Sequence, residues 1–199
     1  MKKIVVVPTP SVTEVLKYLQ KWETLNNYVW QERSLKKLFN KTYPLNNDMD
    51  DILIKVCSLN DFYSTNIFSP FSVAEHIQKL KIDDELRNGD LTLVNKISCI
   101  NIKGKEKNFY SFATKYCSHH FPLIYPIYDS FVEKLLNHFK KIDRFYNFEK
   151  NDLKIYTKFN DILLSFKKFY GLEKFSVKEI DKYLWQVGKE YFPKTYGKT

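Results

Sequence analysis

The chain has 199 residues, of which 44% are hydrophobic and 17% aromatic, so it is long and apolar enough to bury a core as one domain. This composition excludes a disordered or fibrous protein. Lysine and arginine number 32 against 23 aspartates and glutamates, which gives a formal net charge of +9. A basic surface of this strength is compatible with a polyanionic partner, although charge alone does not separate nucleic acid from an acidic membrane or from simple solubility.

Neither a membrane span nor a signal peptide is indicated. The sequence contains no run of about 20 apolar residues that could cross a bilayer. The apolar stretch in the N-terminal MKKIVVVPTP is too short for the core of a signal peptide, so we expect a cytoplasmic protein without a membrane partner. Cys57, Cys99 and Cys117 are widely spaced and form no paired motif. We therefore expect reduced, packed thiols, no metal and no other cofactor.

Apolar residues recur at helical spacing along most of the chain. In the first half this periodicity predicts helices over residues 11–23, 28–39, 50–59, 72–80 and 91–100, preceded by an extended arm over residues 1–10. Residues 42–50 and 60–70 are rich in turn formers and are predicted to be loops. Ser11, Ser72 and Ser176 are each followed three residues later by glutamate, which is the spacing of a capping box at a helix start.

The second half continues this helical pattern. It predicts helices over residues 109–119, 130–139, 152–170 and 176–191, and a tight connection over residues 101–108 that contains one glycine, Gly104. Outside residues 4–7 no alternating strand pattern is present. We therefore expect an all-α fold, a compact bundle of roughly eight helices in a single domain over residues 1–199.

One motif stands out within residues 91–136. Two predicted helices joined by a short lysine-rich hairpin are followed by the sequence Tyr-Pro-Ile-Tyr-Asp-Ser-Phe-Val. This order resembles the helix-hairpin-helix DNA glycosylase superfamily, in which a Pro-x-x-Asp-Thr-x-Val loop follows the second helix. The matching residues are Pro126, Asp129, Ser130 and Val132, with serine in place of threonine, and Ala113 lies at the family's distance before the aspartate.

The resemblance implies roles for particular residues. Asp129 would be the catalytic carboxylate, and Ser111 aligns with the position at which bifunctional members carry a Schiff-base lysine. Serine there would imply a monofunctional enzyme that uses water. Lys115, one helical turn further on, is the alternative nucleophile. The family's hairpin carries two glycines that hold a phosphate, whereas only Gly104 is present here.

The chemistry of base excision explains why these residue types are needed. Cleavage of an N-glycosidic bond develops positive charge on the sugar, which a nearby carboxylate stabilises. The base must first leave the stack and be held between aromatic or apolar faces. The candidate base-pocket residues are Asn60, Asp61, Phe62, Tyr63, Tyr128 and Trp185. The candidate DNA-binding residues are Lys103, Gly104, Lys105, Lys107 and Ser111.

Simpler interpretations exist for several of these residues. Asp129 precedes a helix and is typical of an ordinary N-cap, and Trp185 could be a packing residue. His119 and His120, with Cys117 nearby, could suggest a metal or thiol site, but these positions on one helix point in different directions.

The sequence thus predicts a DNA glycosylase that flips and excises a modified or mispaired base from double-stranded DNA, in repair or in defence against phage DNA. Two other functions stay open. One is a helix-hairpin-helix protein that binds DNA without catalysis, and the other is a helical interaction or regulatory protein whose basic surface has no special meaning. The charge is concentrated late in the chain, because residues 140–199 hold 14 lysines and arginines against 8 acidic residues.

Overall fold

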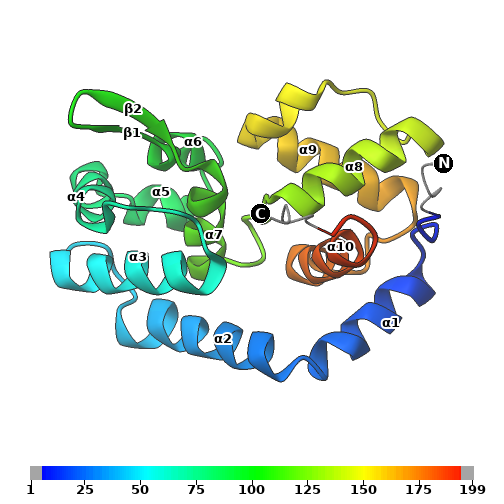
Figure 1. Cartoon of the computed structure of the whole chain (residues 1–199), viewed down its shortest axis with the longest axis horizontal. Coiled ribbons are helices and arrows are strands. Elements are labelled where there is room, and N and C mark those ends of the chain that lie inside the picture. Colours follow the sequence, from blue (N-terminus) through cyan, green and yellow to red (C-terminus); the bar gives the residue numbers. More distant parts are fainter. Residues whose placement is uncertain (1–5, 194–199) are drawn as a thin grey trace, which may run out of the picture.

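The computed structural model describes residues 6–193 and is mostly helical (Figure 1). Within this range its ten α-helices are α1 (Val12–Glu23), α2 (Asn26–Lys37), α3 (Met49–Tyr63), α4 (Pro70–Leu80), α5 (Asp83–Asn88), α6 (Leu93–Ser98), α7 (Tyr110–His120), α8 (Ser130–Asp143), α9 (Tyr156–Phe169) and α10 (Val177–Tyr191). Two further segments are the π-helix η1 (Leu38–Thr42) and the 3-10 helix η2 (Lys150–Lys154). The strands β1 (Cys99–Ile102) and β2 (Lys105–Asn108) form an antiparallel hairpin.

The helices form two groups (Figure 1). One group holds α3 to α7 with the β-hairpin, the other holds α1, α8, α9 and α10, and α2 connects them along one edge of the molecule. The chain returns from the first group to the second through residues 121–129, which we call the crossing segment. One cluster of buried apolar side chains includes residues of both groups, such as Ile77 of α4 and Phe166 of α9. The fold is therefore mainly α-helical, as expected, and the crossing segment lies at its centre.

Among residues 6–193, none of the helices is both long enough and apolar enough to pass through a bilayer.

Three helix starts confirm the capping residues expected from the sequence. At α1 the Ser11 hydroxyl accepts the Glu14 N–H over 3.2 Å. At α10 Ser176 and Glu179 form a reciprocal capping box. Asp129 caps α8 through its carboxylate. Each cap satisfies amide groups that have no partner inside the helix, so these starts are fixed by local chemistry.

The region around residues 60–72 differs from the prediction. Residues 60–63 belong to α3, and the loop begins only at Ser64, which caps the helix in the left-handed conformation with φ 48°. The helix continues because its apolar face continues, and Tyr63 packs against the core. The capping box predicted at Ser72 is also wrong, because α4 already begins at Pro70, a residue suited to the first helical position. The Ser72 hydroxyl instead lies 2.8 Å from that of Ser69.

The connection over residues 101–108 is a β-hairpin rather than the tight turn expected between two helices. Lys103 and Gly104 both have positive φ, 51° and 77°, which is typical of a two-residue type I′ hairpin turn. The Gly104 N–H donates to the Asn101 side chain over 2.8 Å, so this amide is already engaged. The helix predicted over residues 91–100 therefore ends at Ser98, and Ile100 is buried in β1 instead.

The remaining differences concern helix boundaries. The described structure has ten α-helices rather than roughly eight, partly because α5 forms a separate short helix that ends at Gly89. The helix predicted over residues 152–170 is divided into η2 and α9. Residues 6–10 of the predicted arm belong to neither a helix nor a strand, and residues 1–5 lie outside the described range.

The closest approach between α8 and α10 depends on Gly188. A Cβ atom added there would lie 2.7 Å from the Phe131 Cβ and 2.9 Å from the Phe131 carbonyl oxygen. We expect Gly188→Ala to lower the free energy of unfolding by about 1–3 kcal/mol, because the strain exceeds the gain in helix propensity. Chemical denaturation measures this loss. Glu190→Ala is the matched control, since its ion pair with Lys21 is exposed and contributes little. Equal midpoints for the two variants would contradict the close packing.

Candidate functional site

A pocket of about 310 Å³ lies beside the crossing segment. Its walls come from the α1–α2 junction, the end of α3, α7, the crossing segment, the start of α8 and one face of α10. A second hollow of about 400 Å³ lies next to it, toward the base of the β-hairpin. Both are lined by Tyr63, Lys115, Asp129 and Trp185. The fold thus brings together four of the residues that the sequence predicted for one site.

Asp129 performs two tasks at the end of the crossing segment. Its backbone is extended, and its Oδ1 accepts the N–H groups of Phe131 at 2.8 Å and Val132 at 2.9 Å. Because one oxygen takes both amide bonds, Oδ2 takes no part in the cap. The side chain is only half-buried and lines both hollows. A role as N-cap and a position in the pocket are therefore compatible.

Lys115 reaches the pocket wall from the middle of α7. Its side chain is only 4% exposed, and its Nζ donates to the Ser111 hydroxyl over 2.6 Å. The same nitrogen also donates to the Ser111 carbonyl over 3.1 Å and to the Tyr128 carbonyl over 3.4 Å. It lies 5.3 Å from the centre of the Tyr63 ring. The Lys115 amine and the Ser111 hydroxyl thus lie together at the pocket wall, because residues one helical turn apart share a helix face.

Asp181 of α10 is a pocket residue that the sequence analysis did not select. It is 6% exposed, and its Oδ2 accepts the Ile127 N–H of the crossing segment over 3.0 Å. Its Oδ1 is buried and has no hydrogen-bond partner among the described residues. Burial raises the pKa of this carboxyl to about 8, and the nearby Asp129 charge adds to the effect, while Lys178, the Ile127 N–H and Lys115 oppose it. Asp181 therefore holds a proton under conditions in which an exposed aspartate is ionised.

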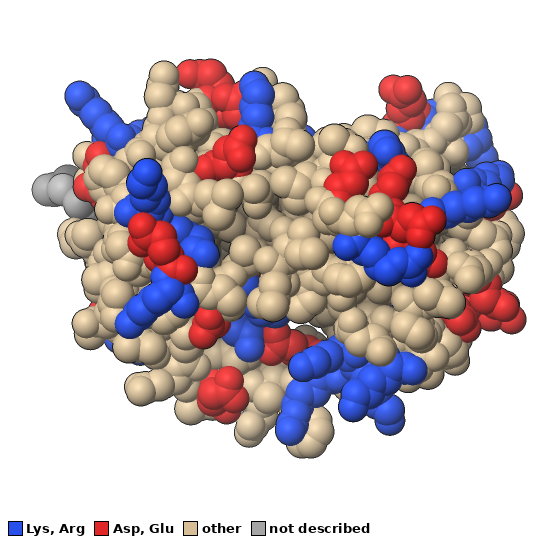
Figure 2. Space-filling view, turned by 180° about the vertical axis from the view of Figure 1, so that it is seen from behind, with Lys and Arg blue, Asp and Glu red and all other residues tan. Residues whose placement is uncertain are grey.

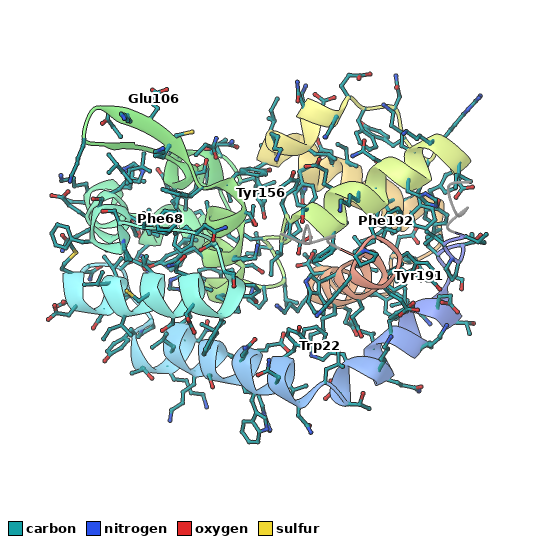
Figure 3. The ribbon with its side chains drawn as sticks, in the orientation of Figure 1. Trp22, Phe68, Glu106, Tyr156, Tyr191 and Phe192 are labelled. Atoms are coloured by element: carbon teal, nitrogen blue, oxygen red, sulfur yellow. The ribbon has the colours of Figure 1, made fainter. Side chains whose placement is uncertain are left out.

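One wall of the pocket is aromatic. Tyr28 and Trp185 pack with their ring centres 4.8 Å apart, and Trp22 lies 5.8 Å from Trp185 in an edge-on contact. Trp22 is near the end of α1, on the side that faces α10 (Figure 3). Lys182 lies over the Trp22 ring, and Lys189 lies over both Tyr28 and Trp185. This wall offers flat apolar surface with cations at its edge.

The residues predicted for a base pocket divide into two sets. Phe62 and Tyr63 line the pocket together with Trp185, and Tyr128 lines the second hollow. Asn60 and Asp61 do not line the pocket. The Asn60 side chain forms hydrogen bonds with Thr65 and with the backbone of Ile67, and Asp61 is exposed. Asn60 therefore stabilises the turn after α3, because its amide replaces the backbone partners that the chain loses there.

The predicted DNA-binding residues lie at some distance from the pocket. Lys103, Lys105 and Lys107 are exposed on the β-hairpin, and none of them lines either hollow. Gly104 forms the hairpin turn. Ser111 differs from them, because it lines the second hollow and bonds the Tyr128 carbonyl over 3.1 Å.

The face of α10 that the sequence analysis missed has a clear periodic signal. Lys178, Asp181, Trp185 and Lys189 are spaced by three, four and four residues, Lys182 directly follows Asp181, and all five line the pocket. Such spacing places side chains on one helical face. A charged face that contains an aromatic residue differs from the apolar face expected of a core helix. This face accounts for part of the positive charge after residue 140.

The histidines and cysteines form no metal centre. His119 bonds the Tyr63 hydroxyl over 3.0 Å, and burial lowers the pKa values of both His119 and His120, the latter to about 3. Burial raises the pKa of the Cys117 thiol. The expectation of packed thiols holds for Cys117 alone, because Cys57 and Cys99 are exposed. In the part of the chain that the structure describes, no cluster of three or more potential ligand side chains could hold a metal.

The raised pKa of Asp181 makes a prediction for stability. Between about pH 4 and pH 8 the folded state retains this proton while the unfolded state loses it, so stability falls as the pH rises through this range. Asp181→Asn removes the titration and keeps an oxygen for the Ile127 N–H. We expect the free energy of unfolding of the variant to rise relative to that of the unsubstituted protein by about 1 kcal/mol or more between pH 5 and pH 8.

Urea denaturation of both proteins across this pH range provides the measurement. Other titrating groups are common to both chains and cancel in the difference. A difference that stays constant with pH would show that Asp181 titrates like an exposed aspartate.

Comparison with known proteins places the chain in a family. The model of the HI_0787_N family, which describes an N-terminal domain, matches residues 14–124, from α1 to the start of the crossing segment. A protein of Haemophilus influenzae with the name "Uncharacterized protein" is 48% identical over 148 residues, which cover 74% of this chain and 71% of the relative. No solved structure matches the chain significantly. The chain therefore belongs to the HI_0787_N family.

Proposed function

We propose that the protein is a DNA glycosylase, which flips a modified or mispaired base out of double-stranded DNA and excises it with water as the nucleophile. One observation carries the proposal: Asp129, Lys115 and the aromatic side chains of Phe62, Tyr63 and Trp185 line one pocket. The resemblance of the Asp129 loop to helix-hairpin-helix glycosylases supports it independently. A cytoplasmic location and a role in repair or in defence against phage DNA belong to the same proposal.

The carboxylate of Asp129 has the features that bond cleavage requires. As the glycosidic bond breaks, the sugar gains positive charge, and a carboxylate at the pocket wall stabilises that charge. The α8 amides hold Oδ1 in place, which leaves Oδ2 to act on the reacting sugar or on the attacking water. A carboxylate fixed in this way needs little reorganisation when charge develops.

The pocket volume and its aromatic wall fit an extruded base. A volume of about 310 Å³ lies at the lower end of the roughly 300–1,000 Å³ found for small-ligand sites. Trp22, Tyr28 and Trp185 offer aromatic faces of the kind that hold a flipped base. Lys189, exposed at the edge of this wall, is placed to contact a backbone phosphate. The lysines of the β-hairpin would contact the duplex further away.

Asp129→Asn tests the catalytic assignment without removing the helix cap, because asparagine is an equally good N-cap. We expect single-turnover base release to fall by at least about 100-fold, since the variant cannot neutralise the positively charged sugar. The measurement is an abasic-site assay on a panel of duplexes with damaged, modified or mispaired bases. Asp48→Asn is the matched control, because Asp48 caps α3 in the same manner and does not line the pocket. Full activity of Asp129→Asn would contradict the assignment.

Lys115 tests the choice between water and an amine nucleophile. Its amine donates to Ser111 and to the Tyr128 carbonyl, so it positions the segment that carries Asp129. We therefore expect borohydride to trap no covalent complex between the protein and DNA. Lys115→Gln should reduce base release because the Asp129 loop loses a contact. The control is Lys158→Gln, at an exposed position of α9 that lines neither hollow. A trapped complex that disappears in Lys115→Gln and persists in Lys158→Gln would instead identify Lys115 as a Schiff-base nucleophile.

A second candidate, DNA binding without catalysis, is favoured by a basic surface on α2 and η1. Arg33, Lys36, Lys37 and Lys41 are all exposed there, and Arg33 lies 5.0 Å from the ring of the exposed Trp30. Figure 2 shows lysine and arginine side chains gathered at the lower edge of the molecule, where α2 runs. Under this function we expect no base release from any duplex. The salt dependence of binding would then decrease by about two counterions when Lys36 and Lys37 are both replaced by glutamine.

A further inference from the structure

We propose that Asp181 is the general acid of this site and that its carboxyl group transfers a proton to the departing base. This inference rests on the proposed glycosylase activity and assigns a second carboxyl group to it. Asp129 would act on the sugar side of the scissile bond, and Asp181 on the base side.

The position of Asp181 carries the inference. The residue is 94% buried, it lines the pocket together with Asp129 and Lys115, and its Oδ1 has no hydrogen-bond partner among the described residues. A buried polar atom without a partner is costly, and native structures retain few of them. Its other oxygen already accepts the Ile127 N–H, which fixes the carboxyl against the crossing segment. The carboxyl of a residue that lines the pocket thus keeps one oxygen without a partner among the described residues.

The titratable groups around Asp181 come from α2, α3, α7, α9, α10 and the crossing segment. The positive groups are Lys178 on the same helix and Lys115 on α7. The negative groups are Asp129 and, more distantly, Glu32 of α2. The neutral hydroxyl groups belong to Tyr63 and Tyr156. Glu32 is neutralised by ion pairs with Lys178 at 3.3 Å and Lys182 at 2.8 Å. Burial outweighs the positive neighbours and raises the pKa of Asp181 to about 8. The carboxyl can thus donate a proton at neutral pH.

The two carboxyl groups differ in the way that acid–base catalysis requires. Asp129 is half-exposed, and its Oδ1 accepts two amide hydrogen bonds. Asp181 is buried with a single amide bond, and the nearby Asp129 charge disfavours a second carboxylate. A buried carboxyl that retains its proton can serve as the acid, while Asp129 stabilises the charge on the sugar.

The proposed step is balanced. The bond between the sugar C1′ and the base nitrogen breaks, and its electron pair goes to the base, which takes the proton from the Asp181 carboxyl. A water molecule attacks C1′ and transfers one proton to the Asp129 carboxylate. The products are the free base, a sugar hydroxyl at C1′, an Asp181 carboxylate and a protonated Asp129. Proton exchange with solvent then restores both groups, and no oxidant or reductant is needed.

Asp181→Asn and the pH dependence of base release test the inference. The assay uses the duplex that the unsubstituted protein processes fastest in the panel, under single-turnover conditions from pH 5 to pH 10. General acid catalysis typically contributes about 10²–10⁴-fold. We therefore expect Asp181→Asn to release base at least about 100-fold more slowly at pH 6. This deficit should shrink above pH 8, where the unsubstituted protein has lost the same proton. Asp161→Asn, at an exposed position on α9, is the matched control.

A deficit of equal size at every pH would overturn the inference, because a merely structural role predicts that result. So would unchanged activity. If the unsubstituted protein released no base from any duplex, the proposed glycosylase function would be rejected, and with it the role of Asp181 as general acid. Should Asp181→Asn not fold, the ¹³C carboxyl resonance of Asp181 in the unsubstituted protein decides the matter. Titration near pH 8 supports the inference, and titration near pH 4 overturns it.

Discussion

The crossing segment between α7 and α8 is held by side chains that bond its backbone, and the site depends on this constraint. The Asp181 carboxyl accepts the Ile127 N–H over 3.0 Å, and the Tyr156 hydroxyl donates to the Pro126 carbonyl over 2.7 Å. Tyr156 lies between the two groups of helices (Figure 3). An irregular segment at the centre of a fold exposes backbone groups that must be paired. Side chains from α9 and α10 provide these partners.

The third helix to contribute is α7. The Tyr128 N–H donates to the Thr114 hydroxyl over 3.2 Å, and the Tyr128 carbonyl accepts from Ser111 and Lys115. Three consecutive residues are thus tied to three different helices immediately before Asp129. These contacts restrict the backbone that carries Asp129, and the α8 cap restricts its carboxylate further. A preorganised carboxylate and a buried protonated one within a single pocket are the chemical basis of the proposed function.

Sequence patterns predicted the features that depend on residues close together in the chain. Ser11, Asp129 and Ser176 were recognisable as caps because a cap depends on residues within one helical turn. The two strands of the β-hairpin were not predicted, because the exposed lysines along β2 leave no apolar alternation to detect. The extension of α3 to Tyr63 was missed because turn-forming residues there are outweighed by packing of the apolar face.

The site was predictable only in part, for a related reason. Asp129, Lys115 and Trp185 were found through a motif or as chemically notable residues, and all three line the pocket. Asp181 has no motif, and its importance comes from burial between helices that are far apart in sequence. Its helical spacing with Lys178 and Trp185 was a signal, but only the fold shows which face of α10 the pocket uses.

A crystal structure of the protein bound to a duplex that contains a tetrahydrofuran abasic analogue tests the central claim most directly. We expect the abasic sugar to be turned out of the duplex into the pocket, with the Asp129 carboxylate against the C1′ position and the Asp181 side chain on the side from which the base has departed. A duplex bound on the outer face of α2, with the pocket left empty, would contradict the claim.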